Sequence, residues 1–341
     1  MTTLCKIYEG KKIWPPPVWL MRQAGRYLPE YNKVRKKAGS FLDLCYNPRY
    51  SSKVTLQPIE RFDLDAAIIF ADILLIAENL NLSLRFEDNI GPIISPNLSN
   101  KFSLEKFIEV ENSRLMNVME SISLTRDVLE KDKSLIGFCG APWTVLTYLI
   151  NGTSTKDFKY CIKWMHNNKI LANELLDLLI KLSTDYLSLQ IEAGADVVKI
   201  FDTWAGVLER EDFMSWVVEP TSKIVSSLKR KYKNIPIIGF PKGAEYLYKE
   251  YIDLTGVDII ALDQDLNRDF CRNILQKSAI LQGNISPNLL RSGGIKLEND
   301  IHDTIEKFRD KPFIINLGHG IIKDTPIVNV ENLIKIIRNH N

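Results

Sequence analysis

The chain has 341 residues and a mass of 39.1 kDa, and 45% of its residues are hydrophobic while 25% are charged. This composition is typical of a globular protein that buries a large core. Its 44 lysines and arginines are balanced by 42 aspartates and glutamates, which leaves a net charge of +2; a nucleic-acid-binding function, which needs a basic surface, is therefore not indicated.

The cysteines and the N-terminus bear on the compartment. Five cysteines are scattered without a Cys-x-x-Cys pair, so neither a disulfide framework nor a zinc ribbon is indicated. No apolar run approaches the roughly 20 residues that a membrane span requires. The opening residues, MTTLCKIYEGKKIW, lack the apolar core of a signal peptide and the arginine-rich pattern of a transit peptide. We expect a cytoplasmic protein with reduced thiols and no membrane association.

Short apolar runs rich in valine and isoleucine recur along the chain. They lack strict alternation of apolar and polar residues, which is typical of strands buried on both faces of a parallel sheet. In chain order they are PVWLM (17–21), DAAIIF (65–70), SLIGFC (134–139), DVVKIF (196–201), IPIIGF (235–240), VDIIALD (257–263), AILQGN (279–284) and FIINLG (313–318).

Helical patterns alternate with these runs. Residues 167–194 carry apolar positions at spacings of three and four and stop at Gly194, and residues 298–310 and 326–339 repeat the pattern more briefly. Eight strand-like runs alternating with helices favour a (β/α)₈ barrel over an open doubly wound sheet, which remains the alternative. The count of eight depends on accepting the first run, which prolines precede.

The segment from 73 to 133 is too long for a simple crossover. Residues 80–100 read as a short hairpin or irregular excursion, and residues 105–130 as an amphipathic helix. Because no internal repeat or low-complexity linker interrupts the chain, we expect a single domain over residues 1–341 with this excursion after the second strand.

Barrel enzymes place catalytic groups just beyond the carboxyl ends of their strands. Each run here is followed by polar side chains, although loops are generally polar and any one of these residues has that ordinary explanation. As a set, they suit a polyanionic ligand whose reaction transfers protons. They are Arg22, Arg26, Asp72, Tyr148, Asp202, Thr203, Lys242, Asp263, Asn284, Ser286 and His319.

The first of these groups lies in MRQAGR (21–26). Two arginines flank a small-residue Ala-Gly step, so the stretch is either an anion-binding loop or a solvated turn. An arginine fork matches a carboxylate bidentately, which a lysine cannot do.

Several stretches resemble the uroporphyrinogen decarboxylase family. PVWLMRQAGRYLPEY and GFCGAPWTVLTYLINGTSTKDF are similar to its two long signatures, and NLGHGI resembles its C-terminal histidine motif. VTLQPIERFDLDAAIIFADIL and IFDTWAG also match, so the similarity runs from about residue 5 to residue 338. The resemblance implies a distorted (β/α)₈ TIM barrel, usually a homodimer, that needs no cofactor or metal.

The same resemblance implies the reaction. The four acetate side chains of uroporphyrinogen III are converted to methyls with release of carbon dioxide, which gives coproporphyrinogen III in porphyrin and heme biosynthesis. It assigns catalytic roles to Asp72, Arg22, Tyr148 and His319. It assigns substrate contacts to Arg22, Gln23, Ala24, Gly25, Arg26, Arg35, Asp72, Tyr148, Thr203 and His319.

Each assignment has a structural alternative. Asp72 is also a plausible helix N-cap, Tyr148 a packing aromatic and Thr203 a strand-end turn residue. Arg35, beside Lys36 and Lys37, also reads as a helix-surface charge, and His319 as an ordinary loop histidine.

The proton donor stays open at this point. A guanidinium with a pKa above about 12 is a poor acid, so a water molecule or His319, with Arg22 nearby, is chemically easier. Three positions depart from the family pattern, namely Asn151, Gln264 and Ser286, and they bear on local packing and loop geometry.

Two other functions were weighed. A zinc-dependent cobalamin or thiol methyltransferase on the same barrel would carry a His-x-Cys pair, whereas Gly320 and Ile321 follow His319. A non-catalytic tetrapyrrole-binding protein would show the same binding residues and is distinguished only by assay.

Overall fold

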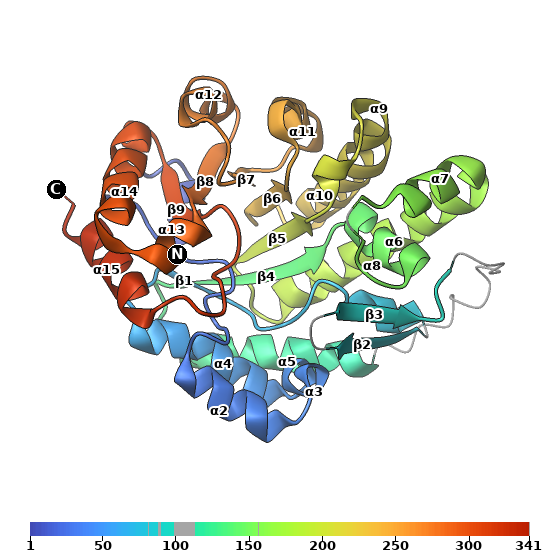
Figure 1. Ribbon diagram of the computed structural model, residues 1–341, viewed down its shortest axis with the longest axis horizontal. Helices are drawn as coiled ribbons and strands as arrows, with labels where there is room; N and C mark the ends of the chain where they lie inside the picture. The colour runs from blue at the N-terminus through green and yellow to red at the C-terminus, as the bar shows by residue number, and fades with distance from the viewer. Residues whose placement is uncertain (81, 88–89, 99–112, 156, 341) are drawn as a thin grey trace.

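Seven parallel strands form one curled sheet in the order β1-β4-β5-β6-β7-β8-β9, and helices surround it (Figure 1). The computed structural model describes residues 1–80, 82–87, 90–98, 113–155 and 157–340. The strands are β1 (Ala66–Ile68), β4 (Ser134–Gly140), β5 (Val197–Asp202), β6 (Ile237–Pro241), β7 (Ile259–Ala261), β8 (Ile280–Ile285) and β9 (Phe313–Leu317). The predicted barrel-like α/β fold is confirmed, and each strand lies within one residue of a predicted run or inside it.

The helices alternate with these strands as the spacing of apolar residues predicts. The predicted helix over 167–194 is α8, which ends next to Gly194 at φ +116°, a conformation that glycine adopts without steric cost. The helices are α1 (Thr3–Tyr8), α2 (Pro29–Ala38), α3 (Phe41–Tyr46), α4 (Pro48–Arg61), α5 (Ser113–Val128), α6 (Pro142–Asn151), α7 (Lys159–Asn167), α8 (Lys169–Glu192), α9 (Arg210–Phe213), α10 (Glu219–Lys231), α11 (Tyr248–Thr255), α12 (Arg268–Asn273), α13 (Pro287–Ser292), α14 (Gly294–Phe308) and α15 (Ile327–Arg338).

The first predicted strand, residues 17–21, is only a single parallel bridge in the structure, between Val18 and Ile315 of β9. Its backbone nevertheless joins the two edges of the sheet. The N–H of Ile315 donates to the carbonyl of Pro17 at 2.8 Å, and the N–H of Asp65, just before β1, donates to the carbonyl of Val18 at 2.9 Å. The first of the eight predicted runs is therefore not a regular strand, and seven strands plus this segment, which we call the closing segment, complete the ring.

Side chains replace the missing backbone pairing of the closing segment. The N–H of Val18 donates to the carboxylate of Asp65 at 2.7 Å, and the N–H of Met21 donates to Oδ1 of Asn316 at 3.0 Å. The physical reason is that Pro15 to Pro17 have no N–H groups to offer a ladder. Specific side-chain acceptors, rather than a regular register, therefore set the position of the loop that follows.

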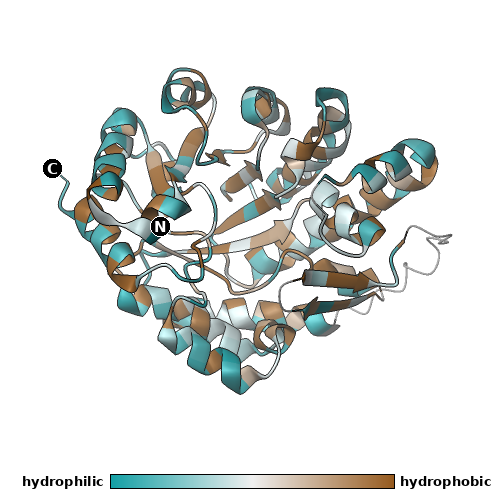
Figure 2. Cartoon of the chain, in the orientation of Figure 1, coloured by the Kyte–Doolittle hydropathy of each residue, from teal (hydrophilic) through white to brown (hydrophobic). Residues whose placement is uncertain are grey.

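Two apolar layers hold the barrel together. Inside it, Trp19, Ile136, Val197 and Ile314 pack with other inward-facing strand residues, and Leu4 and Ile7 of α1 join them at the amino end. A larger layer fills the space between the sheet and the surrounding helices. Figure 2 shows the same division, with apolar strands at the centre and polar outer faces on the helices. Burial of each large apolar side chain stabilises the fold by about 1.5–3 kcal/mol.

The predicted excursion after the second run contains a hairpin. Strands β2 (Ser83–Glu87) and β3 (Gly91–Ser95) pair antiparallel, and residues 81, 88–89 and 99–100 of the predicted stretch lie outside the described residues. The hairpin is tied to the end of α6, because the N–H of Ile94 donates to the carbonyl of Gly152 at 2.7 Å. Of the helix predicted over 105–130, α5 accounts for the part from Ser113 onward, and residues 105–112 are likewise outside the description.

Across the described residues, every helix is too short or too polar to span a membrane.

Candidate active site

The parallel order of the sheet brings polar side chains from distant parts of the sequence to its carboxyl edge. Asp72 follows β1, Tyr148 lies on α6 after β4, Thr203 follows β5 and His319 follows β9, while Arg22 follows the closing segment. Electrostatic coupling places four of them near one another, because Arg22 influences the pKa values of Asp72, Tyr148 and His319. We call this end of the barrel the mouth.

Arg22 is held in a strained turn against the loop that carries His319. Its φ of +60° is uncommon for a residue with a side chain, and such strain costs about 1–3 kcal/mol. The N–H of Ile321 donates to the carbonyl of Met21 at 2.9 Å and ties the two loops together. A Cβ on Gly320 would lie 2.4 Å from Cδ of Arg22, so only glycine lets the arginine stem pass there. The loop of MRQAGR (21–26) and the loop that carries His319 thus form one wall of the mouth.

The guanidinium groups of Arg22 and Arg26 are exposed, and neither makes an ion pair with any of the described residues. Nor do the backbone N–H groups of Ala24 and Gly25 reach an acceptor within that part of the chain. Two arginine forks and two free amides in six residues are donors without acceptors. The arrangement suits an anionic ligand with more than one carboxylate.

Gln23 has a different position from its neighbours. It is buried, its Oε1 accepts from the N–H of Leu20 at 3.0 Å, and its Nε2 donates to the carbonyl of Ala66 at 3.1 Å. Its backbone is also occupied, since its carbonyl accepts from the hydroxyl of Tyr27 at 2.8 Å. Gln23 therefore fixes the loop to β1, and a contact of its side chain with a ligand stays a prediction.

Arg35 lies on α2 and is partly buried. Its Nη1 donates to the carbonyl of Gly39 at 2.7 Å, just past the end of its own helix. It also influences the pKa of Tyr31, as Arg26 does. This is the capping role of a helix-end arginine, and a further contact with a ligand carboxylate stays a prediction.

Asp72 is the carboxylate of the mouth. Its Oδ1 accepts from the N–H of Leu74 at 2.9 Å, while Oδ2 has no hydrogen-bond partner among the described residues. Burial raises its pKa to about 6, and the Leu74 N–H and the positive charge of Arg22 only partly oppose this shift. The free oxygen is an acceptor that awaits a donor from outside the protein.

Tyr148 and Thr203 carry hydroxyl groups at the same end of the barrel, and Tyr148 is electrostatically coupled to Asp72. The oxygen of Tyr148 accepts from Nε1 of Trp204 at 3.3 Å, and burial, followed by the effect of Asp72, raises the pKa of the phenol. Thr203 is half-buried, and its hydroxyl has no partner in the described part of the chain. Both groups can hydrogen-bond a carboxylate without forming a full ion pair with it.

His319 is uncharged in the ligand-free protein at neutral pH. Burial, followed by the positive charges of Arg22 and Lys242 and by that of Lys199 in its protonated form, lowers its pKa to about 4. A neutral imidazole is a poor proton donor, so His319 needs nearby anions before it can act as an acid.

Two lysines are absent from the predicted catalytic and substrate-binding residues, although Lys242 is among the polar residues predicted at the strand ends. Lys242 follows β6, is partly buried and influences His319. Lys199 lies in the middle of β5 and is completely buried. The sequence does mark Lys199 as unusual. It lies inside DVVKIF, a run predicted to be buried on both faces, and lysines are almost never fully buried without a partner.

Other polar residues at the strand ends tie loops together. Oδ2 of Asp263 accepts from the N–H of Gly243 at 2.6 Å and from the hydroxyl of Tyr248 at 2.8 Å. Nδ2 of Asn284 donates to the carbonyl of Asp263 at 2.9 Å, and Asp202 is fully buried with Thr144 donating to it at 2.6 Å. Asp263 and Asn284 are therefore occupied inside the protein, whereas Oδ2 of Asp202 has no partner among the described residues.

The three departures from the family pattern lie in loops and at helix ends. Asn151 ends α6 and donates weakly to Thr155 at 3.3 Å. Gln264 is approached so closely by the loop after β9 that a Cβ on Gly318 would lie 2.1 Å from its backbone nitrogen. Ser286 precedes α13 without a side-chain cap.

Comparison with known proteins gives one consistent family. The sequence model described as uroporphyrinogen decarboxylase matches residues 1–340. A uroporphyrinogen decarboxylase from Chelativorans sp. is 46% identical over 98% of this chain and 97% of its own length. One from Orientia tsutsugamushi is 45% identical over 95% and 94%. Among solved structures, a methyltransferase from Methanosarcina mazei shares the fold, with a TM-score of 0.79 at 20% identity and coverage of 98% and 97%.

Proposed function

We propose that this chain, which belongs to the uroporphyrinogen decarboxylase family, binds and decarboxylates its substrate at the mouth of the barrel. The chain is a carboxy-lyase of porphyrin and heme biosynthesis, and its substrate is uroporphyrinogen. The single observation that carries the proposed site is Asp72, a partly buried carboxylate with one oxygen that has no partner among the described residues, near arginines that form no ion pair with those residues.

Asp72 is suited to the centre of a tetrapyrrole. The four pyrrole N–H groups are donors, and an ionised carboxylate is an acceptor-only group that can collect them. Protonation of a pyrrole carbon gives a cation that accepts the electron pair of the C–CO₂ bond as carbon dioxide leaves. The methylene carbon that remains on the ring then takes up a proton to become the methyl group, and the pyrrole carbon releases the proton that it gained first, so one proton is consumed for each carbon dioxide released. A fixed anion stabilises the cationic transition state more than the neutral substrate.

The arginines have a different task. An arginine that held the reacting acetate tightly would stabilise the carboxylate that must disappear, and would raise the barrier. We therefore assign Arg22, Arg26, and the amides of Ala24 and Gly25 to carboxylates that are not reacting. Tyr148 and Thr203, which lack full charge, are the better contacts for the acetate that reacts. Gln23 acts by holding the loop in place.

Proton delivery follows from the state of His319. Its lowered pKa leaves it neutral in the ligand-free protein, but the carboxylates of a bound substrate would favour its protonated form. A protonated His319, or a water molecule beside it and Arg22, then supplies the proton. Arg22 itself is not assigned this step, because a guanidinium does not release its proton at neutral pH.

The direct test is anaerobic incubation of the protein with uroporphyrinogen III, followed by oxidation and chromatographic separation of the porphyrins by carboxyl number. We expect products with seven, six, five and finally four carboxyls, since the four acetates are lost and the four propionates remain. Unchanged uroporphyrin after prolonged incubation with folded protein would overturn the proposed function.

The methyltransferase alternative is not favoured. The relatives that are 43–46% identical carry the decarboxylase name, and the methyltransferase similarity, at 20% identity, concerns the fold alone. Loss of methyl transfer on chelation of zinc would be its signature in an assay, whereas decarboxylation in the presence of a chelator supports the cofactor-free reaction that we propose.

Four further properties remain part of the proposal. We infer a single domain over residues 1–341, a homodimer, a cytoplasmic location and no nucleic-acid or membrane partner. Sedimentation equilibrium tests the dimer, and fractionation of the source cells tests the location. The family resemblance supports the dimer and the single domain, while the near-neutral net charge of +2 supports the absence of nucleic acid.

A further inference from the structure

Lys199 lies inside the barrel, below the mouth. It is the middle inward-facing residue of β5, between Val197 toward the amino end and Phe201 toward the mouth, and none of its surface is exposed. Its side chain crosses the interior to the closing segment, where Nζ lies 3.5 Å from Sδ of Met21. A lysine on one wall of the barrel thus contacts the residue that precedes Arg22 on another.

The surroundings of this amine are apolar and aromatic. Nζ lies 5.1 Å from the ring centre of Trp19, 4.5 Å from that of Phe201 and 5.0 Å from that of Phe240. Within the described residues it forms no ion pair and has no oxygen acceptor. Burial therefore lowers the pKa of Lys199 well below its usual range. The rings, however, offer faces that stabilise an ammonium once a charge is present.

The amine is electrostatically connected to the mouth. In its protonated form it is the last of the causes that lower the pKa of His319, after burial, Arg22 and Lys242. Phe201, one of the rings around it, is partly exposed and comes two residues before Thr203. The charged or titratable groups at this end of the neighbouring elements are Arg22 after the closing segment, Asp72 after β1, Asp202 at the end of β5, Lys242 after β6, Asp263 after β7 and His319 after β9. Of the three carboxyl groups, Asp202 is hydrogen-bonded to Thr144, and Asp263 to Gly243 and Tyr248.

We propose that Lys199 is a buried counter-charge for the substrate, uncharged in the ligand-free protein and protonated when a polycarboxylate ring occupies the mouth. This rests on the proposed function, because the ring supplies the negative charge. Carboxylates brought above a low-dielectric interior lower the free energy of a cation below them. Lys199 is then a positioning residue: it attracts the ring as a whole and touches no single carboxylate, so it does not hold the reacting acetate in place.

The test measures protons taken up on binding. Coproporphyrinogen III, the four-carboxyl product, is titrated anaerobically into the protein by calorimetry at pH 7.5 in two buffers of different ionisation enthalpy. We expect Lys199→Met to take up about one proton fewer per ring than the wild type, since a group that changes charge on binding contributes its proton to the linkage. His319→Asn is the matched control, because His319 also faces the ring. His319→Asn should remove only the protons that His319 takes up on binding and should leave the proton taken up by Lys199.

Methionine has an apolar chain of similar length, so the variant should keep its fold and its melting temperature should not fall. Lys199→Gln is the second variant if methionine packs poorly. An independent measurement is NMR of wild-type protein labelled at the lysine Cε carbons. The resonance that is absent from the spectrum of Lys199→Met belongs to Lys199. Its chemical shift should be that of a neutral amine in the free protein and that of an ammonium after coproporphyrinogen III is added.

The outcomes separate the two proposals. Equal proton uptake by wild type and Lys199→Met, or an ammonium already present in the free protein, would overturn the role of Lys199 while decarboxylation of uroporphyrinogen continued. Absence of decarboxylation by the wild type would instead overturn the proposed function itself.

Discussion

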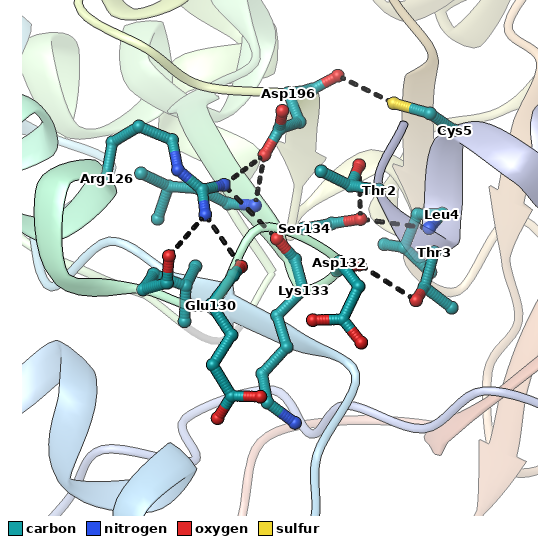
Figure 3. A network of polar contacts seen from close by, with 12 residues as sticks. Thr2, Thr3, Leu4, Cys5, Arg126, Glu130, Asp132, Lys133, Ser134 and Asp196 are labelled. Carbon is teal, nitrogen blue, oxygen red and sulfur yellow. Dashed lines mark hydrogen bonds and ion pairs between the residues drawn. The ribbon is translucent and has the colours of Figure 1, made fainter.

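The two ends of the barrel each carry an arginine and an aspartate, and they use them in opposite ways. At the amino end, Nη1 of Arg126 donates to Oδ2 of Asp196 at 2.7 Å, and the same oxygen accepts from the N–H of Leu135 at 2.8 Å (Figure 3). At the mouth, Arg22 and Asp72 influence each other without a hydrogen bond between them among the described contacts. We call the hydrogen-bonded pair of Arg126 and Asp196 the closed pair, and the pair of Arg22 and Asp72 the open pair.

The closed pair belongs to a network that seals the barrel floor. Arg126 also donates to the carbonyls of Leu129, Glu130 and Lys133, at 2.8, 2.9 and 3.2 Å. Beside it, the N–H of Leu4 in α1 donates to the hydroxyl of Ser134 at 2.9 Å (Figure 3). Both Nη atoms of Arg126 have oxygen acceptors, so the charges of the floor stabilise the fold. The charges of the mouth are left for a ligand, and four experiments can break or sharpen this contrast.

Asp72→Asn should have the largest effect. It keeps the shape and removes the charge, so we expect kcat to fall by about 10²–10³-fold, the loss typical of one electrostatic stabiliser. Stability should move the other way. The pKa of Asp72 is raised to about 6 in the folded state, so its contribution to stability is present below the unfolded pKa and is lost as the pH rises through 6. At pH 7.5 the variant should therefore gain roughly 1–3 kcal/mol of unfolding free energy.

Melting curves at pH 7.5 and pH 5 check the second half of this prediction. The advantage of Asp72→Asn should shrink at the lower pH, where the wild-type carboxyl is protonated. A variant with normal turnover, or one that is less stable than the wild type at pH 7.5, would contradict the contrast between the two ends.

Arg22→Gly should come next. Loss of a charge-assisted contact of about 1.5–3 kcal/mol predicts a roughly 10–150-fold fall in kcat/KM. The folded protein should be little affected, because relief of the positive φ is offset by the greater freedom of glycine in the unfolded chain. Steady-state kinetics and a denaturation curve on one preparation measure both. If Arg22→Gly lowers stability but not kcat/KM, then Arg22 stabilises the fold and does not bind substrate.

Arg126→Met tests the closed pair. It strands the partly buried carboxylate of Asp196 and three carbonyl groups, so we expect a loss of roughly 2–3 kcal/mol in unfolding free energy with kcat unchanged for folded protein. Arg272→Met is the matched control, since the exposed ion pair of Arg272 with Asp310 should contribute under about 1 kcal/mol. Similar urea midpoints for the two variants would argue against a special role for the floor network.

The pH dependence should be the smallest effect. Because Asp72 must be ionised, kcat/KM of the wild type should fall below pH 6 and be about tenfold lower at pH 5. His319→Asn should keep this acid limb, since the pKa of His319 is already lowered to about 4. If kcat/KM stays constant down to pH 5, the reaction does not require an ionised Asp72.

Much of this architecture is readable from the sequence. Buried strand runs predict the parallel sheet, and a parallel sheet brings Asp72, Tyr148 and His319 to one edge. What the sequence does not show depends on contacts between distant residues. The closing segment is held by Asp65 and Asn316, so its local pattern cannot reveal that it lacks a ladder.

Individual side chains also differ in how much of their role can be predicted from the sequence. Gln23 stands in a ligand-binding motif, yet its amide is bonded to Leu20 and Ala66, which only the folded backbone reveals. The strained φ of Arg22 and its passage over Gly320 likewise depend on a loop about 300 residues away in the chain. Lys199 was visible as an anomaly in its strand, but its aromatic surroundings come from three different wall segments.

The closing segment also gives the barrel a seam. Elsewhere in the ring the strands are joined by regular ladders, but here a few side chains and single backbone contacts join β9 to β1. A seam of this kind is where the ring should open most often by local unfolding. We propose that the residues that follow it bind the ligand, and bound substrate should then hold the seam closed. Amide hydrogen exchange at Trp19 and Ile315 would then slow on binding, while exchange in the β4–β5 ladder would change little.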